Sequence, residues 1–403
     1  MRELVAVDLP GGETFVEAVR QIWDAGDAVL PVDQRLSPDE RQQVLGQARP
    51  RSVLGGSRGE RFSFDPAAPP VGEDEALVVP TSGSTGAAKF IVHTFGSLSA
   101  HARAVHHRLE VDPASDRWLC CLPLVHLGGL GVVVRSLITD TGFDVLARFD
   151  AGAVERSTAE LGTTLVSLVP TALDRIDPSP FRWVVVGGAP DARPRPGNVV
   201  RTYGLTETGG GVVYDGVPLP GVQVALRPDG PDPVGGHDGP DRGGEAGAGR
   251  VAVRGATLCT GIRSNDGSVG ALVDDEGWLL TEDLGRWSDD GRLVVDGRAD
   301  DLIISGGENL WPEPIEAVLR SHPGVDDVAV IGRSDPGWGQ RVVAVVVPAN
   351  PAWPPSFDEL RRFVSDRLSP VHAPHELVVV DHLPRTSLGK VRRPDLGSFV
   401  GED

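Results

Sequence analysis

Short apolar runs alternate with amphipathic or glycine-rich segments through the middle of the chain. Runs of this length, bounded by turn-forming residues, predict buried strands. Their alternation with helical segments predicts an α/β sheet whose faces are covered by helices. The runs lie in EALVVP (75–80), WLCCLPL (118–124), TTLVSLVP (163–170), RWVVVGGAP (182–190) and VVRTYG (199–204).

The chain before these runs predicts two helices around one strand. The second helix has Ser37 where an N-cap belongs, and Pro38 follows at the first helical position, where its missing N–H costs nothing. Arginine, glycine and proline dominate residues 49–72, which predicts a loop. The expected elements are helix 13–26, strand 28–32 and helix 37–48, with a further helix over 97–109.

The last part of the chain predicts a second domain. Residues 228–249 are low in complexity and predict a flexible loop between the strands VQVALR and GRVAVRG. A boundary is expected near Asp300, because helices and strands after it suffice for a compact α+β unit. These are DLIISGG (301–307), helix 312–321, strand 325–332, the run QRVVAVVVP (340–348), helix 357–368 and ELVVVDHLP (376–384). We therefore predict domains 1–299 and 300–403.

Charge and composition narrow the class of protein. The 403 residues carry a formal net charge of -19, which repels nucleic acid and anionic membranes, so neither is expected as a partner. The N-terminus lacks a secretory signal, and no apolar stretch is long enough to span a bilayer. The three cysteines, Cys120, Cys121 and Cys259, show no metal-ligand spacing. A reduced, cytoplasmic protein is the simplest prediction.

The stretch TSGSTGAAK, residues 81–89, follows the apolar run EALVVP. Its hydroxyls, its two glycines and its terminal lysine can wrap a polyphosphate, although the spacing is not that of a P-loop. A flexible surface loop is the alternative. Only two of the 38 Lys and Arg residues are lysines, Lys89 and Lys390. Both lie in Gly/Ser/Thr-containing motifs, which indicates sites where a guanidinium cannot replace an ammonium group.

Three further motifs offer groups for nucleotide chemistry. In YGLTETGGG (203–211), Glu207 is a candidate Mg²⁺ ligand and Tyr203 can stack on a base; the alternative is a turn with a solvated glutamate. In TEDLGRW (281–287) and GRADD (297–301), Asp283 can accept ribose hydroxyls; the alternative is hairpin turn chemistry around DDG. PRTSLGKVRR (384–393) holds Lys390; the alternative is an exposed basic tail.

In this order, TSGSTGAAK, YGLTE, TEDLG, GRADDLIISGGENLWPEPIE and PRTSLGK resemble the adenylate-forming superfamily of acyl-CoA synthetases, luciferases and adenylation domains. The resemblance spans residues 75–393. Five motifs in order are far more specific than one. The alternative interpretation given for each motif above is therefore disfavoured. The resemblance implies an α/β fold: a large N-terminal domain of helix-packed α/β sheets with a small β-barrel-like part, and a small mobile α+β C-terminal domain.

The resemblance also implies roles for single residues. Tyr203 would pack on adenine, Glu207 would bind Mg²⁺, and Asp283 and Arg298 would hold the ribose. Residues 81–89 would hold the phosphates. The implied ATP site is Thr81, Ser82, Gly83, Ser84, Thr85, Gly86, Lys89, Gly188, Tyr203, Gly204, Thr206, Asp283 and Arg298.

The match has three departures. The family's loop often ends PKG, whereas this chain has AAKF, so Ala88 and Phe90 depart from the pattern while Lys89 remains. TED replaces the commoner TGD, although Asp283 is kept. The segment before the phosphate loop is shorter than usual, which indicates a trimmed N-terminal subdomain.

Two half-reactions follow from the resemblance. A substrate carboxylate attacks the α-phosphate of ATP, and Lys390 is expected to bridge these two anions. The C-terminal domain then rotates about Asp300, Lys390 leaves, and Gly306 and Gly307 let the coenzyme A thiol approach the acyl-adenylate. ATP, Mg²⁺ and coenzyme A are therefore the expected cofactors and co-substrates.

The segments LPLVHLGGLGVVVRSL, SLVPT and YDGVPLPGV resemble the o-succinylbenzoate–CoA ligases of menaquinone biosynthesis. His126 and Arg135 match that family's His and the Arg nine residues later. Its substrate is a dicarboxylate, for which a second cationic contact makes chemical sense. The resemblance implies a catalytic or gating role for His126 and an acid site of His126, Arg135, Ser167 and Gly187.

Other interpretations stay open. Arg135 could form a structural ion pair, and Ser167 could make a hydrogen bond at a strand end. The chain could activate another aryl or aliphatic acid, load a separate carrier protein, or be an inactive binding module. A homodimer is possible, since the sequence does not determine the oligomeric state.

Overall fold

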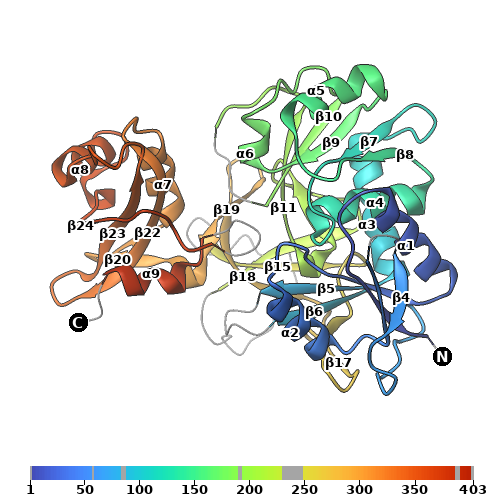
Figure 1. Ribbon diagram of the computed structural model, residues 1–403. Coiled ribbons are helices and arrows are strands. Elements are labelled where there is room, and N and C mark those ends of the chain that lie inside the picture. The colour runs from blue at the N-terminus through green and yellow to red at the C-terminus, as the bar shows by residue number, and fades with distance from the viewer. Residues whose placement is uncertain are drawn as a thin grey trace. The chain divides into compact units, whose positions relative to one another are not determined.

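The computed structural model describes residues 2–56, 59–82, 88–188, 193–228, 248–385 and 391–400 (Figure 1). Contacts within the chain divide it into two compact units. The large unit comprises Met1–Arg227, Ala252–Thr281 and Trp287–Val294. The small unit comprises Pro228–Val251, Glu282–Arg286 and Val295–Asp403. The architecture is α/β, as predicted, with a larger N-terminal and a smaller C-terminal part.

The first sheet of the large unit has eight strands in the order β17-β16-β6-β5-β2-β1-β3-β4. Strands β3, β1, β2 and β5 run parallel, whereas β4, β6, β16 and β17 pair antiparallel with their neighbours. The bounds are β1 Leu4–Val7, β2 Ala28–Pro31, β3 Ser52–Gly55, β4 Glu60–Ser63, β5 Glu75–Ser82, β6 Ala88–Thr94, β16 Gly261–Arg263 and β17 Val269–Gly270.

Two helices of the N-terminal segment pack on this sheet. Helix α1 (Glu13–Asp24) buries its apolar face, as its helical spacing predicts. Helix α2 (Pro38–Ala48) begins after Ser37, whose hydroxyl accepts from the Glu40 N–H while the Glu40 carboxylate accepts from the Ser37 N–H. Leu45 of α2 packs among alternate residues of β1 and β2, so both helices predicted here are confirmed.

The prediction of a loop over 49–72 is wrong, because β3 and β4 lie in this segment. All four residues of β4 are exposed at the sheet edge, Phe62 included, so this strand has no alternation of buried apolar and exposed polar positions. Strands β1 and β6 are further additions to the predicted elements. The sequence predicted that a helix would follow the phosphate-type stretch directly, but strand β6 comes first. The predicted helix then follows as α3 (Phe95–Leu109) and is confirmed.

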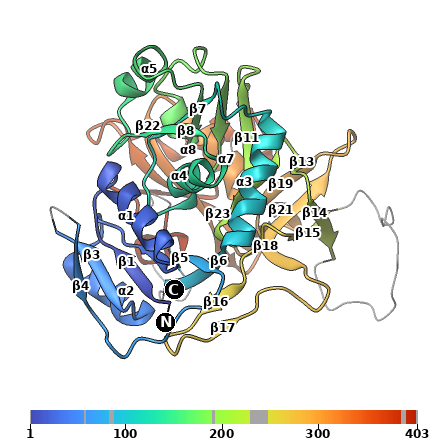
Figure 2. The same ribbon diagram turned by 90° about the vertical axis from the view of Figure 1, so that its right-hand side faces the viewer.

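The second sheet of the large unit has seven strands in the order β13-β12-β11-β10-β9-β7-β8. Helices α3 and α4 lie between the two sheets: α3 packs on α4, β6 and β12, and α4 packs on β7 and β9 (Figure 2). The bounds are β7 Arg117–Cys120, β8 Gly142–Val145, β9 Leu165–Leu168, β10 Trp183–Val186, β11 Val199–Leu205, β12 Gly210–Tyr214, β13 Val217–Pro218, α4 Leu127–Thr139, α5 Ala151–Glu160 and α6 Pro170–Leu173.

A third sheet has four strands in the order β14-β15-β18-β19. Its strands are β14 Val222–Arg227, β15 Ala248–Gly255, β18 Leu279–Trp287 and β19 Leu293–Arg298. The predicted strands on either side of the low-complexity segment are therefore confirmed, whereas residues 229–247 lie outside the described residues.

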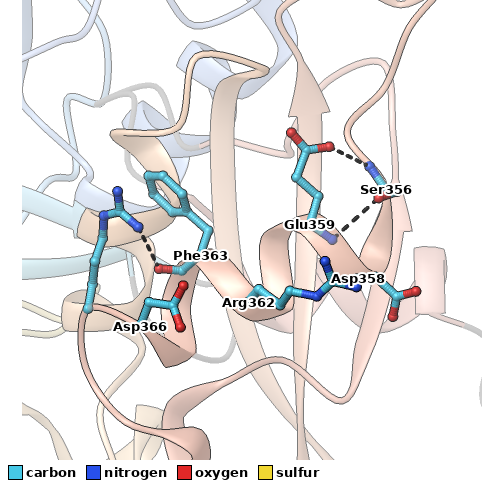
Figure 3. A pocket seen from close by; sticks show the side chains of 7 residues that line it. Ser356, Asp358, Glu359, Arg362, Phe363 and Asp366 are labelled. Carbon is cyan, nitrogen blue, oxygen red and sulfur yellow. Dashed lines mark hydrogen bonds between the residues drawn. The ribbon is translucent and has the colours of Figure 1, made fainter.

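The small unit has a sheet in the order β21-β20-β23-β22, with β24 parallel to β23. Alternate residues of β22 face two cores: Val328 packs with α7 and α8, and Ala329 packs with α9. The Ser356–Glu359 capping bonds that begin α8 are visible in Figure 3. The bounds are β20 Ile303–Ser305, β21 Glu308–Leu310, α7 Pro312–Arg320, β22 Val325–Asp335, β23 Gly339–Pro348, α8 Phe357–Ser365, β24 Glu376–Val379 and α9 Arg393–Val400.

None of the described helices combines the length and the apolar character needed to cross a bilayer. The boundary expected near Asp300 stays a prediction.

Candidate active site

The predicted phosphate loop joins the antiparallel strands β5 and β6, so it is the loop of a hairpin. Thr81 pairs with Lys89 across the hairpin, and the Thr81 hydroxyl lies 3.5 Å from the Lys89 carbonyl oxygen. The Lys89 side chain is exposed. Of the predicted phosphate ligands, Gly83, Ser84, Thr85 and Gly86, together with the side chain of Ser82, lie outside the described residues.

The Thr-Glu-Thr turn, residues 206–208, joins β11 to β12. A Cβ on Gly204 would lie 2.0 Å from the Gly210 carbonyl oxygen, so this crossing requires glycine. The hydroxyl of buried Thr208 accepts from the Leu205 N–H at 2.8 Å and lies 2.7 Å from the Gly210 carbonyl oxygen. The turn is therefore held from inside, and it presents Thr206 and Glu207 in a fixed local conformation.

Two buried histidines support this turn from behind. The His93 Nε2–H donates to the Thr206 carbonyl at 2.7 Å, and the His101 Nε2–H donates to the Gly211 carbonyl at 3.0 Å. Burial lowers the pKa of His93 to about 4 and that of His101 to about 3. Both imidazoles are therefore neutral near pH 7; the His93 donor stays on the turn and the His101 donor on the strand that follows it.

The donor set around Glu207 fits Mg²⁺ held chiefly by nucleotide phosphates. Mg²⁺ commonly takes one or two protein carboxylates and completes its shell with substrate phosphates and water. The turn supplies one carboxylate, Glu207, beside the Thr206 hydroxyl. Among the described residues, no group of three or more His, Cys, Asp and Glu could form a metal site without the nucleotide.

The predicted acid-binding residues Ser167 and Gly187 come from neighbouring strand ends of the second sheet. Gly187 follows β10, and its N–H donates to the Leu168 carbonyl at 3.1 Å. A Cβ on Gly187 would lie 2.6 Å from the Thr202 hydroxyl. The Ser167 hydroxyl is buried and has no hydrogen-bond partner in the described part of the chain, so the proposed strand-end bond is absent there.

Gly188 continues the same strand end in a conformation that suits glycine. Its φ is 86°, in the left-handed region. Gly188, which is predicted to contact the adenine, therefore lies at a backbone turn immediately after Gly187. Tyr203, predicted to pack on adenine, lies half-buried in β11, where the β11–β12 register shifts between Tyr203 and Gly204.

Arg135 is 5% exposed and lies in α4. Its Nε–H donates to the Gly131 carbonyl at 2.8 Å, and its guanidinium lies 4.7 Å from the centre of the Trp118 ring. Its Nη1 has no hydrogen-bond partner among the residues described by the structure. Burial lowers the pKa of Arg135, although neighbouring Tyr214 and Cys120 oppose the shift.

A structural ion pair was the alternative interpretation of Arg135. No carboxylate of the described residues pairs with it. Burying a guanidinium is costly unless its charge meets a partner. The unpartnered Nη1 therefore favours a role in binding an anion, the role that the resemblance implies.

His126 directly precedes α4 and contacts a residue that the sequence interpretation missed. Its Nε2 lies 2.9 Å from Nη2 of Arg35 and 4.0 Å from Oδ2 of Asp33. Arg35 and Asp33 follow β2 in the first sheet, and Arg35 is 91 positions away from His126 along the chain. In the sequence, Arg35 was marked only by the polar residues DQR that follow the apolar run AVLPV. That pattern does not indicate which residue Arg35 contacts.

The remaining described candidates lie in the small unit. Asp283 is 7% exposed in β18. Arg298 donates to Asp300, the predicted hinge residue, at 3.3 Å. Gly306 and Gly307 have φ of 61° and 85° and join β20 to β21. Two successive positive φ values define a two-residue type I′ hairpin turn, in which the backbone carries no side-chain bulk.

Lys390, the predicted catalytic lysine, lies outside the described residues. A hollow on the small unit is lined by Ser356, Asp358, Glu359, Arg362, Phe363, Asp366 and Arg367 (Figure 3). None of these seven residues belongs to a predicted motif. The hollow therefore adds nothing to the candidate active site.

The sequence matches one family of known enzymes and several of its members. The family described as AMP-binding enzyme matches residues 2–262, and its C-terminal domain, AMP-binding enzyme C-terminal domain, matches residues 314–390. A probable 2-succinylbenzoate–CoA ligase of Mycobacterium tuberculosis is 39% identical over 394 residues, covering 90% of this chain and 94% of the relative. A 2-succinylbenzoate–CoA ligase of Bacillus licheniformis is 33% identical, covering 95% and 86%.

Solved structures agree with these relatives. The o-succinylbenzoate CoA synthetase of Bacillus subtilis in complex with its acyl-adenylate intermediate has a TM-score of 0.82 at 27% identity, covering 98% of this chain and 88% of that chain. The same enzyme with ATP and magnesium ion has a TM-score of 0.81 at 27% identity, covering 98% and 89%. The chain therefore belongs to the AMP-binding enzyme family, as its five ordered motifs predict.

Proposed function

We propose that this protein is an ATP-dependent carboxylate–CoA ligase that works through an acyl-adenylate, with 2-succinylbenzoate as its acid. The observation that carries the choice of acid is the buried Nη1 of Arg135, on the helix that follows His126, which has no hydrogen-bond partner within the described ranges of the chain. A dicarboxylate keeps one negative charge after its other carboxylate is activated. A buried guanidinium is suited to such a charge. The named relatives support the same acid.

In the first half-reaction, a carboxylate oxygen attacks the α-phosphorus of ATP. The bond from that phosphorus to the bridging oxygen breaks, and pyrophosphate leaves with the electron pair. Lys89 neutralises phosphate charge, and Lys390 bridges the two anions as they approach. Glu207 would hold Mg²⁺, which would offset the charge of the phosphates.

In the second half-reaction, the sulfur of coenzyme A attacks the acyl carbonyl, and AMP leaves. We propose that the small domain rotates about Asp300 between the two steps. The Gly306–Gly307 turn has no side chain beyond Cα, which lets the pantetheine arm approach its backbone. The formal net charge of -19 favours small-molecule partners over nucleic acid or anionic lipid.

Pyrophosphate release over a panel of carboxylic acids, with and without coenzyme A, tests this function. We expect turnover with 2-succinylbenzoate and a thioester product that requires coenzyme A. Good turnover with another acid and none with 2-succinylbenzoate would overturn the assignment of the acid and leave the chemistry standing. If a thioester forms only when a carrier protein is added, the carrier's thiol is the acceptor in place of coenzyme A.

Two variants separate the half-reactions. Lys390→Ala should abolish adenylate formation while the enzyme still converts supplied acyl-adenylate to the thioester. Asp300→Pro should spare adenylation and slow the thioester step, because proline fixes φ at the hinge. An equal loss of both steps in Lys390→Ala would contradict a role for Lys390 in adenylation only. An unchanged thioester step in Asp300→Pro would contradict the assignment of Asp300 as the hinge.

A further inference from the structure

Arg35 lies at the edge of the first sheet from which the predicted phosphate loop emerges. Strand β2 is parallel to β5, with Val29 opposite Leu77. Asp33 and Thr81 each follow these paired residues by four positions, so they stand at the same level on adjoining chains. In open α/β sheets, ligands bind beyond the carboxyl ends of parallel strands. The Asp33–Arg35 segment is therefore placed beside the nucleotide side of the site.

His126 lies at the corresponding edge of the second sheet. It follows β7 and precedes α4, so it too is reached beyond the carboxyl end of a parallel strand. The 2.9 Å contact between Arg35 and His126 joins these two edges within the large unit. The contact therefore links the strand end beside the phosphate loop to the predicted acid site.

Asp33 fixes the Arg35 guanidinium. Its Oδ1 accepts from Nε at 2.9 Å and its Oδ2 accepts from Nη2 at 2.7 Å, a two-pronged pair, while the Arg35 backbone N–H also donates to Oδ1 at 2.9 Å. The Asp33 side chain is only 10% exposed. Burial raises the pKa of Asp33, but the bonds and charge of Arg35 outweigh this and hold it below its usual value. The carboxylate is thus ionised and paired.

The geometry determines which nitrogen of His126 carries the proton. A guanidinium has five N–H donors and no acceptor. Nη2 can therefore meet His126 Nε2 only as a donor, which makes Nε2 the acceptor and puts the imidazole proton on Nδ1. His126 is consequently held as one neutral tautomer, with its ring oriented by the fixed guanidinium.

We propose that Arg35, clamped by Asp33, is a positioning residue that holds His126 in the Nδ1-protonated, neutral form that the acid site uses. Arg35 acts on the substrate through His126. Its charge is already matched by Asp33, so it is not the second cation that the dicarboxylate requires. The inference rests on the proposed function for its catalytic consequence, but the tautomer itself is a property of the free protein.

The matched variants are Arg35→Met and Arg35→Lys, with Arg41→Met as the control. Arg41 pairs with Asp8 at 3.2 Å through a partly exposed side chain. Its loss therefore removes a nearby arginine–aspartate ion pair that does not include His126. Methionine keeps the length of Arg35 without a donor. Lysine keeps the charge but loses the planar fork that reaches both partners.

The first measurement is the ¹⁵N chemical shifts of the His126 ring in the free protein, assigned by their loss in His126→Gln. We expect Nδ1 to carry the proton in the wild type and in Arg41→Met, and we expect this preference to disappear in Arg35→Met. Proton on Nε2 in the wild type, or an unchanged spectrum in Arg35→Met, overturns the proposal. This result does not depend on which acid the enzyme uses.

The second measurement is kcat/KM for pyrophosphate release with 2-succinylbenzoate and with its two single-carboxylate analogues, 3-benzoylpropanoate and 2-propanoylbenzoate. Loss of a charged hydrogen bond corresponds to about a 10- to 100-fold effect. Arg35→Met should show this loss with the dicarboxylate and equally with the analogue that is turned over. Arg35→Lys should recover only part of it. A loss confined to the dicarboxylate would show direct binding by Arg35 and overturn the positioning role.

Discussion

Three buried histidines of α3 and β6 should make the stability of the large unit depend on pH. His93 donates to the Thr206 carbonyl of the Thr-Glu-Thr turn, and His101 donates to the Gly211 carbonyl of β12. His106 accepts from the Trp118 indole N–H at 3.4 Å. Burial lowers the pKa of His93 and of His106 to about 4, and that of His101 to about 3. In the unfolded chain each would titrate near its ordinary value of about 6.5.

The magnitude follows from this difference. Between about pH 4 and pH 6.5 the unfolded chain binds more protons than the folded one, so the free energy of unfolding rises with pH and is lost as pH falls. From pH 7 to pH 5 each histidine should cost about 2 kcal/mol, and the three together about 6 kcal/mol. This is comparable to the whole stability of many domains, about 5–15 kcal/mol.

Urea unfolding at pH 7, 6 and 5, followed by tryptophan fluorescence and circular dichroism, measures the effect. His101→Gln keeps an N–H donor for the Gly211 carbonyl but cannot titrate, so its loss from pH 7 to pH 5 should be smaller than that of the wild type by about 2 kcal/mol. His107→Gln is the control, because His107 is exposed on the same helix. Full wild-type pH dependence in His101→Gln would refute the reasoning.

Three other predictions concern different groups. Gly204→Ala should weaken ATP binding at least tenfold by calorimetry, because its Cβ would meet the Gly210 carbonyl oxygen, whereas Gly197→Ala meets nothing within 4 Å; equal affinity in both variants would contradict this. The three cysteines are buried, and burial raises the pKa of every thiol, so Ellman's reagent at pH 8 should react only after urea is added; rapid reaction of the folded protein would count against it. Lys89→Met should raise KM for ATP about 10- to 100-fold and leave KM for the acid unchanged, and a change confined to the acid would move Lys89 away from the phosphates.

The sequence predicts those parts of the fold whose cause is local. Helix α2 could be predicted because Ser37, Pro38 and Glu40 carry its capping signal in adjacent positions. The family motifs were found for the same reason, since each is a continuous stretch. Strand β4 could not be predicted, because all its residues are exposed and it exists only through its pairing with β3.

The acid side of the site shows the limit more sharply. His126 and Arg135 were found through a resemblance, and the burial of Arg135 could not be inferred from the mixed apolar and glycine pattern of its helix. Arg35 was missed because its meaning depends on a partner far along the chain. No local pattern encodes such a contact between the edges of two sheets. The hinge, Lys390 and the phosphate-loop residues stay predictions.

The eight-stranded sheet has a consequence for synthesis on the ribosome. Strand β6 gains its outer neighbour only from β16, whose residues 261–263 emerge long after residues 88–94. Arg263 then donates to the carbonyls of Pro69 and Pro70, 194 and 193 positions earlier. Until that point the nascent chain exposes an unpaired, apolar edge strand, a ready template for pairing with other chains. The growing polypeptide therefore carries this edge uncovered until about two thirds of it has been made.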